Sequence, residues 1–339
     1  MSKELVLVTG ATGFIASHTI DELIKRGYRV RGTVRSAKYQ NVVDTIKVPG
    51  LEFVEINDVA TGDFTEALKG VDAVLHIACP LPGRVSREEV FKTAVEGALN
   101  VVRQAQEAGI KRFVVTSSFG TLLSPTHMPA FHGLNIDESQ WGENNDEEFE
   151  EKKDDPYYVY FAAKIKEERA LWDFAAQHPD IKVVTIHPGY VIGPYSRTFP
   201  LPTAVANMGT NDFIFKMINK GEIPFAPNWI VDVRDVARGH VLALEKLDTL
   251  PADDLKRFVI NAVLQPWSKA AEHLKKTRPE VADRIIPLEE VKPLPGVLST
   301  LDNTRSKEIL GMDYLPIEQT YDEAVTDLLE LEKIWKNQN

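Results

Sequence analysis

Short runs of apolar residues, many of them β-branched, alternate with longer segments of helical periodicity up to His187. The first run, residues 5–9, ends at Gly10, and apolar residues then recur at helical spacing until Gly27. The most regular helix is expected over residues 87–108. Strands are expected over residues 5–9, 29–34, 51–56, 73–77, 112–117 and 182–187. Nearly apolar strands that alternate with helices predict an α/β fold with a doubly wound parallel sheet, covered on both faces.

The alternation ends after the fifth expected strand. Residues 118–156 interrupt it with proline, histidine and glycine and an acidic run at residues 143–155, which we expect to be a solvated loop. Later helices are expected near residues 211–220, 233–247 and 319–336, and short apolar runs lie at 258–260 and 285–286. We therefore expect a Rossmann-type domain over residues 1–188, to which about residues 229–262 return, and a smaller C-terminal lobe over residues 189–339.

Composition and charge narrow the class of protein. The 339 residues are 43% hydrophobic and 26% charged, which is typical of a globular protein, and no apolar run approaches the roughly 20 residues that span a bilayer. The net charge of −11 disfavours nucleic acids and anionic membranes as partners, although the eight acids and two lysines of residues 143–155 supply −6 of it. The single cysteine, Cys79, excludes an intrachain disulfide and a cysteine zinc cluster, and the N-terminus lacks a signal-peptide pattern. We therefore expect a cytoplasmic protein. We also expect no bound metal, because the eight histidines show no paired ligand spacing.

Small residues occupy the turn between the first strand and the first helix, where the sequence reads Thr-Gly-Ala-Thr-Gly-Phe-Ile-Ala from residue 9. Gly10 permits a sharp turn, Gly13 lets a ligand approach the backbone, and Ala16 still allows the helix to pack closely on the strand. A helix that begins at this place can bind the pyrophosphate of a dinucleotide. The residues expected to contact it are Gly10, Thr12, Gly13, Phe14 and Ile15.

The end of the second expected strand indicates which dinucleotide binds. A carboxylate at this place accepts hydrogen bonds from the ribose of NAD(H), whereas an arginine binds the 2′-phosphate of NADP(H). No acidic residue occurs before Asp44, but Arg35 ends the strand, and Ser36 and Lys38 follow it. The predicted cofactor is therefore NADP(H), held by Arg35 and Lys38.

A tyrosine and a lysine four residues apart, Tyr160 and Lys164, fall on one face of an expected helix. We expect the lysine to lower the pKa of the phenol, because an ordinary pKa of about 10 makes tyrosine a poor acid–base catalyst at neutral pH. Ser117 and Ser118 follow the fifth expected strand, at the carboxyl edge where ligands of open α/β sheets bind. A serine there can hold a substrate carbonyl while the tyrosine protonates it.

In this order the motifs resemble the extended short-chain dehydrogenases/reductases, in the branch of dihydroflavonol reductase, cinnamoyl-CoA reductase and fungal aldehyde or carbonyl reductases. The resemblance covers almost the whole chain. It rests on the glycine turn, the serine strand end, the Tyr160–Lys164 pair and residues 30–35, 70–78, 187–194 and 302–311. It implies that Ser118 is the catalytic serine, with Ser117 as the alternative. It also implies that Tyr160 is the acid–base residue and contacts the cofactor, and that Lys164 tunes it and binds ribose.

The same resemblance implies further cofactor contacts. Asp58 and Val59 would flank the adenine, and Pro188 and Val191 would contact the nicotinamide end. The residues that would line the cofactor after the fourth strand are Ala78 and Cys79, the latter as an inert wall. Asn100 is open to two interpretations, a water-structuring residue near the site or, preferred, a structural residue of its helix.

Two departures limit what the resemblance implies about the substrate. The segment between Ser118 and Tyr160 is longer than in the plant reductases, and the motif that marks cinnamoyl-CoA reductases is missing. Aromatic residues of the later lobe favour a hydrophobic or aromatic carbonyl substrate, with core packing as the alternative for each of them. These residues are Phe199, Phe213, Phe225 and Trp229.

The expected activity is the NADPH-dependent reduction of aldehydes or ketones, by a monomer or a homodimer. One alternative is an NAD-dependent sugar-nucleotide epimerase or dehydratase, which Arg35 disfavours. The other is a dinucleotide-sensing protein without catalysis, which the retained tyrosine, lysine and serine disfavour.

Overall fold

A seven-stranded parallel sheet forms the centre of the molecule in the computed structural model, which describes residues 4–79, 92–221, 226–287, 290–291 and 294–337. The strand order is β10-β7-β5-β4-β1-β2-β3. The bounds are β1 Leu5–Val8, β2 Arg29–Val34, β3 Leu51–Glu55, β4 Ala73–His76, β5 Arg112–Thr116, β7 Lys182–Pro188 and β10 Arg257–Ile260. The predicted doubly wound α/β fold is confirmed, with strands within two residues of their expected limits.

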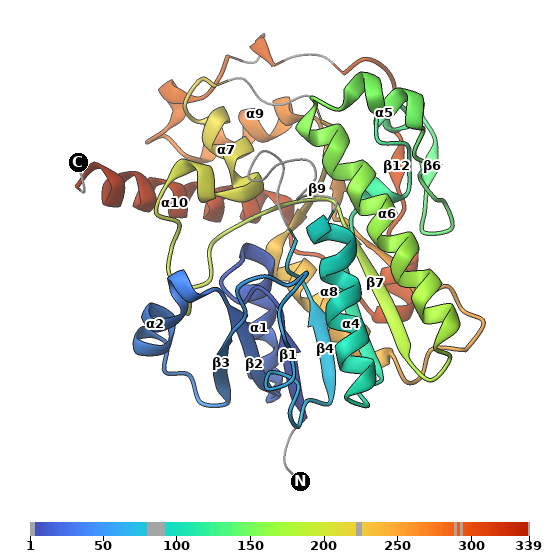
Figure 1. Cartoon of the computed structure of the whole chain (residues 1–339). Coiled ribbons are helices and arrows are strands. Elements are labelled where there is room, and N and C mark those ends of the chain that lie inside the picture. The colour runs from blue at the N-terminus through green and yellow to red at the C-terminus, as the bar shows by residue number, and fades with distance from the viewer. Residues whose placement is uncertain (1–3, 80–91, 222–225, 288–289, 292–293, 338–339) are drawn as a thin grey trace.

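Helices cover both faces of this sheet (Figure 1). Helices α1 (Phe14–Arg26) and α8 (Val233–Lys246) pack together on one face, and α4 (Gly97–Glu107) and α6 (Pro156–Gln177) cover the other. The sequence of β1 is apolar throughout because both faces of the strand are buried. Val6 packs into the core beneath α1 and α8, and Leu7 packs into the core beneath α4. Helix α2 (Ser36–Thr45) connects β2 to β3.

A second group of elements lies beyond the carboxyl ends of the strands, opposite the N-terminus (Figure 1). Its strands are β8 (Tyr190–Ile192), β9 (Trp229–Asp232) and β11 (Val263–Leu264), and a separate pair joins β6 (Asn135–Ile136) to β12 (Thr300–Leu301). Its helices are α7 (Asp212–Met217), α9 (Trp267–Thr277) and α10 (Ile317–Lys336), with α5 (Asp146–Lys152) beside them. The short helical turns in the part of the chain that the structure describes are η1 Lys92–Glu96, η2 Phe119–Thr121, η3 Met128–Phe131, η4 Val205–Asn207, η5 Gly209–Asn211, η6 Ala282–Arg284 and η8 Ser306–Leu310.

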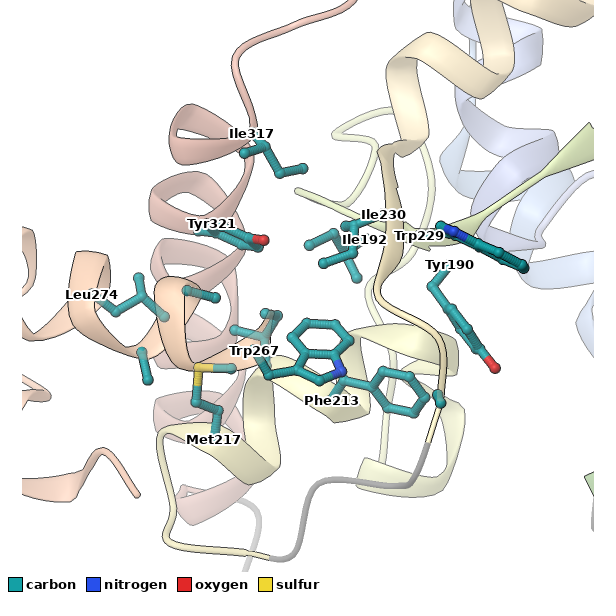
Figure 2. Close-up of a cluster of buried hydrophobic side chains, with 14 of the residues drawn as sticks. Tyr190, Ile192, Phe213, Met217, Trp229, Ile230, Trp267, Leu274, Ile317 and Tyr321 are labelled. Carbon is teal, nitrogen blue, oxygen red and sulfur yellow. The ribbon is translucent and has the colours of Figure 1, made fainter. Parts of the chain in front are cut away.

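Aromatic side chains fill the core of this second group. Phe213 lies between Tyr190 and Trp267, with ring centroids 5.2 Å and 5.5 Å apart (Figure 2). Trp229 is fully buried, and its indole N–H donates to the Ser299 carbonyl at 2.8 Å. Large rings with satisfied polar atoms give this part of the molecule a rigid interior.

The expectation for the acidic run differs from the structure. The run is not only a loop, because α5 forms within it: Asn145 caps the helix by accepting from the Glu148 N–H at 3.0 Å. Of the helix expected over 87–108, residues 87–91 lie outside the described residues, and from Lys92 onward it is present as the π-helical turn η1 followed by α4. The apolar run at residues 285–286 is buried. None of the described helices is both long and apolar enough to cross a membrane.

Candidate active site

All seven parallel strands of the sheet end at one edge, and most of the predicted site residues lie at or just after these ends. Gly10 follows β1 with a φ of +70°, and a Cβ atom there would come within 3.1 Å of the Ala78 Cβ atom, which follows β4. The Gly10 N–H donates to the Thr33 hydroxyl at 3.0 Å. Glycine is therefore required at position 10, both by the left-handed backbone and by the neighbouring strand.

The start of α1 is suited to bind a phosphate group. Gly13 is the N-cap, no side chain caps the helix, and its first turn carries no acidic residue. Among the described residues, no side chain thus competes for the first backbone N–H groups at the positive helix end. Thr12, Phe14 and Ile15 are all partly exposed at this point.

A hydroxyl that the sequence analysis did not single out holds the neighbouring loop. The Thr9 hydroxyl accepts from the N–H groups of Ile77 and Ala78 at 2.9 Å and 3.0 Å, and it lies 2.9 Å from Nδ1 of His76. Burial lowers the pKa of His76 to about 3, so this imidazole is neutral and can accept the threonine proton. The wall that carries Ala78 and Cys79 is thereby fixed against the glycine turn.

Arg31 and Arg35, within β2 and directly after it, have different environments. Arg31 is engaged, pairing with Glu52 at 2.6 Å and donating to the carbonyls of Ala67 and Lys69, each at 2.8 Å. Arg35 is the exposed residue before α2, and its side chain makes no hydrogen bond or ion pair with the described residues. Lys38 is exposed one turn further along. The guanidinium of Arg35 is therefore available to a ligand at this edge.

The residues assigned to the adenine end lie in the loop after β3. Asp58 is exposed, and its carboxylate accepts from the Ala60 N–H at 2.9 Å and the Thr61 hydroxyl at 2.7 Å, which lowers its pKa. Val59 is partly buried beside it. Asn100 donates to the carbonyls of Val59 and Gly62, each at 3.0 Å, so it holds this loop, which favours the structural interpretation.

Helix α6 carries the tyrosine and the lysine, and its cap sets their position. The Asp155 carboxylate accepts from the Tyr157 N–H at 2.9 Å and fixes the first turn, and Tyr160 and Lys164 follow on one face. Lys164 is buried, and its Nζ donates to the Thr116 carbonyl at the end of β5 at 3.0 Å. The helix is thus joined directly to the carboxyl edge of the sheet.

The two serines after β5 point to different partners. The Ser117 hydroxyl donates to Oε2 of the buried Glu168 at 2.7 Å, away from Tyr160. Among the described residues, the one hydrogen bond of the Ser118 hydroxyl is that which it accepts from the Gly120 N–H at 3.1 Å, so its proton can be donated to a carbonyl oxygen. Of the two candidates, Ser118 has the arrangement that substrate binding requires.

The expected lowering of the Tyr160 pKa by Lys164 is wrong for the protein without a cofactor. Burial raises the pKa of Tyr160 well above its usual value, and the Cys79 thiol and the Glu167 carboxylate raise it further. The physical reason is that Lys164 already pairs with Glu167 at 2.7 Å, so the ammonium charge is largely compensated. Tyr160 is consequently a protonated phenol at neutral pH.

The interpretation of Cys79 as a wall residue is compatible with its surroundings. Its thiol hydrogen-bonds with the side chains of Tyr160 and Lys164. Burial, and to a smaller extent Glu167, raise the pKa of this thiol to about 11. Cys79 is thus a thiol and not a thiolate at neutral pH, which disfavours it as a nucleophile.

A buried ionic network lies behind the serines, and the sequence analysis missed it. Arg257 of β10 donates from Nε to Oε1 of Glu168 at 2.8 Å, and the two side chains are 1% and 2% exposed. His187 also contacts Glu168, with Nε2 3.2 Å from Oε1, and its Nδ1 lies 3.1 Å from the Ser118 carbonyl. Burial alone would raise the pKa of Glu168, yet His187 and Arg257 hold it well below its usual range.

The remaining predicted residues divide between two places. Pro188 and Val191 are buried where the chain passes from β7 to β8, at the carboxyl edge. Trp229 packs edge-to-face on Phe119, with centroids 5.2 Å apart, and Phe213 belongs to the same cluster. Phe199 lies elsewhere, against Phe53 of β3 at 6.3 Å. Phe225 lies outside the described residues.

A sheet of this order, with a glycine turn at its first strand and a Tyr-x3-Lys helix at its carboxyl edge, defines a short-chain dehydrogenase/reductase. The model of the NAD dependent epimerase/dehydratase family matches residues 6–260. The chain therefore belongs to this family of extended short-chain dehydrogenases/reductases.

Known relatives and a solved structure extend this likeness over nearly the whole chain. Ketoreductase azaE of Aspergillus niger is 33% identical over 344 residues, which cover 96% of this chain and 97% of the relative. Aldehyde reductase 2 of Sporidiobolus salmonicolor is 32% identical over 342 residues, which cover 96% and 95%. The crystal structure of Gre2 from Candida albicans in complex with NADPH matches with a TM-score of 0.83 and 27% identity, covering 97% of this chain and 99% of that one.

Proposed function

We propose that this protein reduces aldehydes or ketones to alcohols with NADPH, and that Ser118, Tyr160 and Lys164 carry the acid–base chemistry. The observation that carries the proposal is the placement of a protonated Tyr160, a buried Lys164 and an available Ser118 hydroxyl at the edge where the glycine turn ends. A tyrosine that keeps its proton at neutral pH is suited to donate it, as carbonyl reduction requires. The similarity to ketoreductases and aldehyde reductases supports this activity over sugar-nucleotide epimerisation.

The residues of the edge fit a bound NADPH. The uncapped start of α1 offers backbone N–H groups to the pyrophosphate, and Gly10 and Gly13 let it approach the backbone closely. Arg35 offers to the 2′-phosphate a guanidinium that no described residue pairs with, and the exposed Lys38 follows one turn later. We assign the adenine end to the loop of Asp58 and Val59. The nicotinamide end is assigned to Ala78, Cys79, Pro188 and Val191.

When bound, NADPH supplies the hydride that reduces the carbonyl carbon. The Ser118 hydroxyl and the Tyr160 phenol both donate to the carbonyl oxygen and stabilise the negative charge that develops on it. Tyr160 then transfers its proton to that oxygen, and the Lys164 ammonium stabilises the resulting phenolate. Lys164 is buried and Tyr160 is half-buried, which strengthens these interactions because water screens them less than at the surface.

We assign the cofactor mainly to residues 1–188, to which about residues 229–262 return, and the substrate mainly to the rest of residues 189–339. The second group of elements, which this later part of the chain largely forms, lies beyond the carboxyl ends of the strands (Figure 1). Phe119, Tyr190 and Trp229 form a continuous aromatic group, with Phe119 5.2 Å from each of the other two rings. Phe119 directly follows Ser118, so a hydrophobic or aromatic carbonyl compound is the substrate class that we favour. We also propose a cytoplasmic monomer or homodimer, since a reducing compartment suits the single thiol.

The function is tested by following the absorbance of NADPH and NADH during incubation with aliphatic and aromatic aldehydes, ketones and β-keto esters. We expect NADPH consumption with stoichiometric formation of the alcohol. If no carbonyl compound oxidises either cofactor and the purified protein retains NAD, the chain is an epimerase or dehydratase. Tight NADPH binding without turnover over the whole panel would identify a dinucleotide sensor.

The cofactor assignment gives a separate prediction for Arg35→Gln. A charge-assisted hydrogen bond contributes about 1.5–3 kcal/mol, so the KM for NADPH should rise about 10- to 100-fold. NADH has no 2′-phosphate and is the internal control, because its KM should change little. Steady-state kinetics with both cofactors measure the effect. Equal changes for the two cofactors would show that Arg35 does not bind the 2′-phosphate.

A further inference from the structure

Glu167 lies next to the catalytic lysine in the interior of the protein. Its Oε1 atom accepts from Lys164 Nζ at 2.7 Å, and the two side chains are 4% and 1% exposed. The spacing of three residues on α6 places the carboxylate one turn beyond the lysine, on the same helix face. Lys164 is therefore held from two sides, by Glu167 and by the Thr116 carbonyl at 3.0 Å.

The second carboxylate oxygen of Glu167 has no partner. Oε2 is buried and accepts no hydrogen bond from any residue that the structure describes. A buried carboxylate with an unpaired oxygen is costly unless its charge is balanced nearby, and Lys164 is the cation that balances it. The charge of Glu167 is thus directed at the same ammonium on which Tyr160 depends.

We propose that Glu167 is a positioning residue of the reductase site, which holds the Lys164 ammonium in place and sets the upper pH limit of turnover. The inference rests on the proposed function, because it requires Tyr160 to be the proton donor. Glu167 touches neither substrate nor cofactor in this assignment and acts only through Lys164 and Tyr160.

The charged and titratable groups around this pair come from several elements. On α6 they are Tyr160 and Glu168, and the latter is turned toward Arg257 and His187. The end of β4 and the loop after it bring His76 and Cys79, and β5 brings only the Thr116 carbonyl. The turn η1, which packs against α6, carries the exposed Lys92 and Glu96.

Glu167 raises the pKa of Lys164 and the pKa of Tyr160. Although burial alone would lower it, the pKa of Lys164 is raised, with Cys79 and Glu167 as the first two causes. The same carboxylate raises the pKa of Tyr160. Removing its charge therefore lowers both pKa values, so that Tyr160 or Lys164 loses its proton at a lower pH. Either loss abolishes reduction, because the phenol must donate a proton and the ammonium must stabilise the phenolate.

The pH dependence of kcat tests this inference at saturating NADPH and substrate. We expect the alkaline limb of Glu167→Gln to lie about one pH unit below that of the wild type. Glu167→Asp keeps the charge and should restore most of the wild-type limb. Asp173→Asn removes an exposed carboxylate from the same helix and should leave the limb in place. Should Glu167→Gln fail to fold, Glu167→Ser removes the same charge and leaves space for water.

A second measurement does not require turnover. Cys79 is the only cysteine of the chain and hydrogen-bonds with both Tyr160 and Lys164, so its alkylation reports on this position alone. Loss of the Glu167 charge lowers the thiol pKa, and alkylation by iodoacetamide below that pKa should accelerate about tenfold for each unit. Asp173→Asn should react at the wild-type rate.

The two measurements separate the inference from the proposed function. If the wild type reduces no carbonyl compound but Glu167→Gln is alkylated faster, the proposed function fails and the electrostatic role of Glu167 stands. If the wild type is an active reductase and Glu167→Gln shows an unchanged alkaline limb and an unchanged alkylation rate, Glu167 is only a structural partner of Lys164.

Discussion

Replacing Tyr160 with phenylalanine is expected to lower kcat for carbonyl reduction by about 10²- to 10⁴-fold, the usual contribution of a positioned general acid. The ring and its packing against Phe161, with centroids 5.1 Å apart, are retained. What is lost is the proton that neutralises the developing alkoxide and one of the two donors to its oxygen. The KM for NADPH should change little, because the phenol is assigned to the substrate carbonyl. Single-turnover kinetics of NADPH oxidation measure the loss without interference from product release.

Tyr158→Phe is the matched control for this prediction. Tyr158 lies on the same helix, but its hydroxyl donates to Glu148 of α5 at 3.2 Å and faces away from the site. Its loss should reduce stability slightly and leave kcat unchanged. A Tyr160→Phe variant that turns over at the wild-type rate would refute the assignment of Tyr160 as the proton donor.

The largest loss of stability is expected from Arg257→Met. Removing one partner of a buried ion pair leaves an uncompensated charge and costs about 3–5 kcal/mol of unfolding free energy. Arg257 also donates to the carbonyls of Glu138 and Gln140 at 2.6 Å and 2.7 Å, and its guanidinium stacks on Trp141 with 3.7 Å to the ring centroid. All of these interactions are lost with the guanidinium. Urea unfolding at neutral pH measures the change.

Two further variants test the physical cause of this loss. Arg103→Met breaks a pair with Glu96 in which both side chains are about half exposed, and it should cost no more than about 1 kcal/mol. Adding Glu168→Gln to Arg257→Met removes the stranded carboxylate and should recover part of the lost stability. A loss from Arg257→Met equal to that from Arg103→Met would mean that the buried network contributes nothing to stability.

Acid should weaken this network in the wild type. The pKa of Glu168 is held below its value in the unfolded chain, so its contribution is present at neutral pH and is lost as the pH falls through the folded pKa. In Arg257→Met the guanidinium no longer holds this pKa low. The stability of the variant should therefore depend less on pH over the acidic range.

The sheet and the cofactor edge were predictable because their information is local. Gly10 lies between a strand and a helix within a few residues, and its positive φ is a property that the sequence context alone requires. The Tyr160–Lys164 pair is likewise visible as a spacing on one helix. Apolar strands such as β1 follow from burial on both faces, which needs no knowledge of the partners.

The network behind the serines was not predictable, because its members are distant in sequence. Glu168 and Arg257 are 89 residues apart, and neither stands out among the charged residues of the chain. The pKa of Tyr160 was predicted to be lowered but is raised, for a related reason: the prediction included the charge of Lys164 and left out that of Glu167. That signal was available, since a carboxylate three residues beyond a helical lysine is a common pairing distance.

The helix α5 and the position of Phe199 show two further limits. Composition favoured a solvated loop for residues 143–155, whereas a single Asn145 cap is enough to start a helix there. Phe199 was grouped with the lobe aromatics because it is close to them in sequence, but it packs against the far side of the sheet at Phe53. Proximity along the chain does not determine which core receives a ring.

The late arrival of β10 has a consequence for synthesis on the ribosome. When the first 188 residues have emerged, β7 can pair with β5, but its other edge has no partner until residues 257–260 are delivered. Over the same interval Arg257 has not been synthesised, so Glu168 lacks its guanidinium partner. The nascent chain thus exposes the free edge of β7 and the unpaired carboxylate of Glu168. A free strand edge favours pairing with other chains. When β10 pairs with β7, it covers this edge and at the same time places Arg257 beside Glu168.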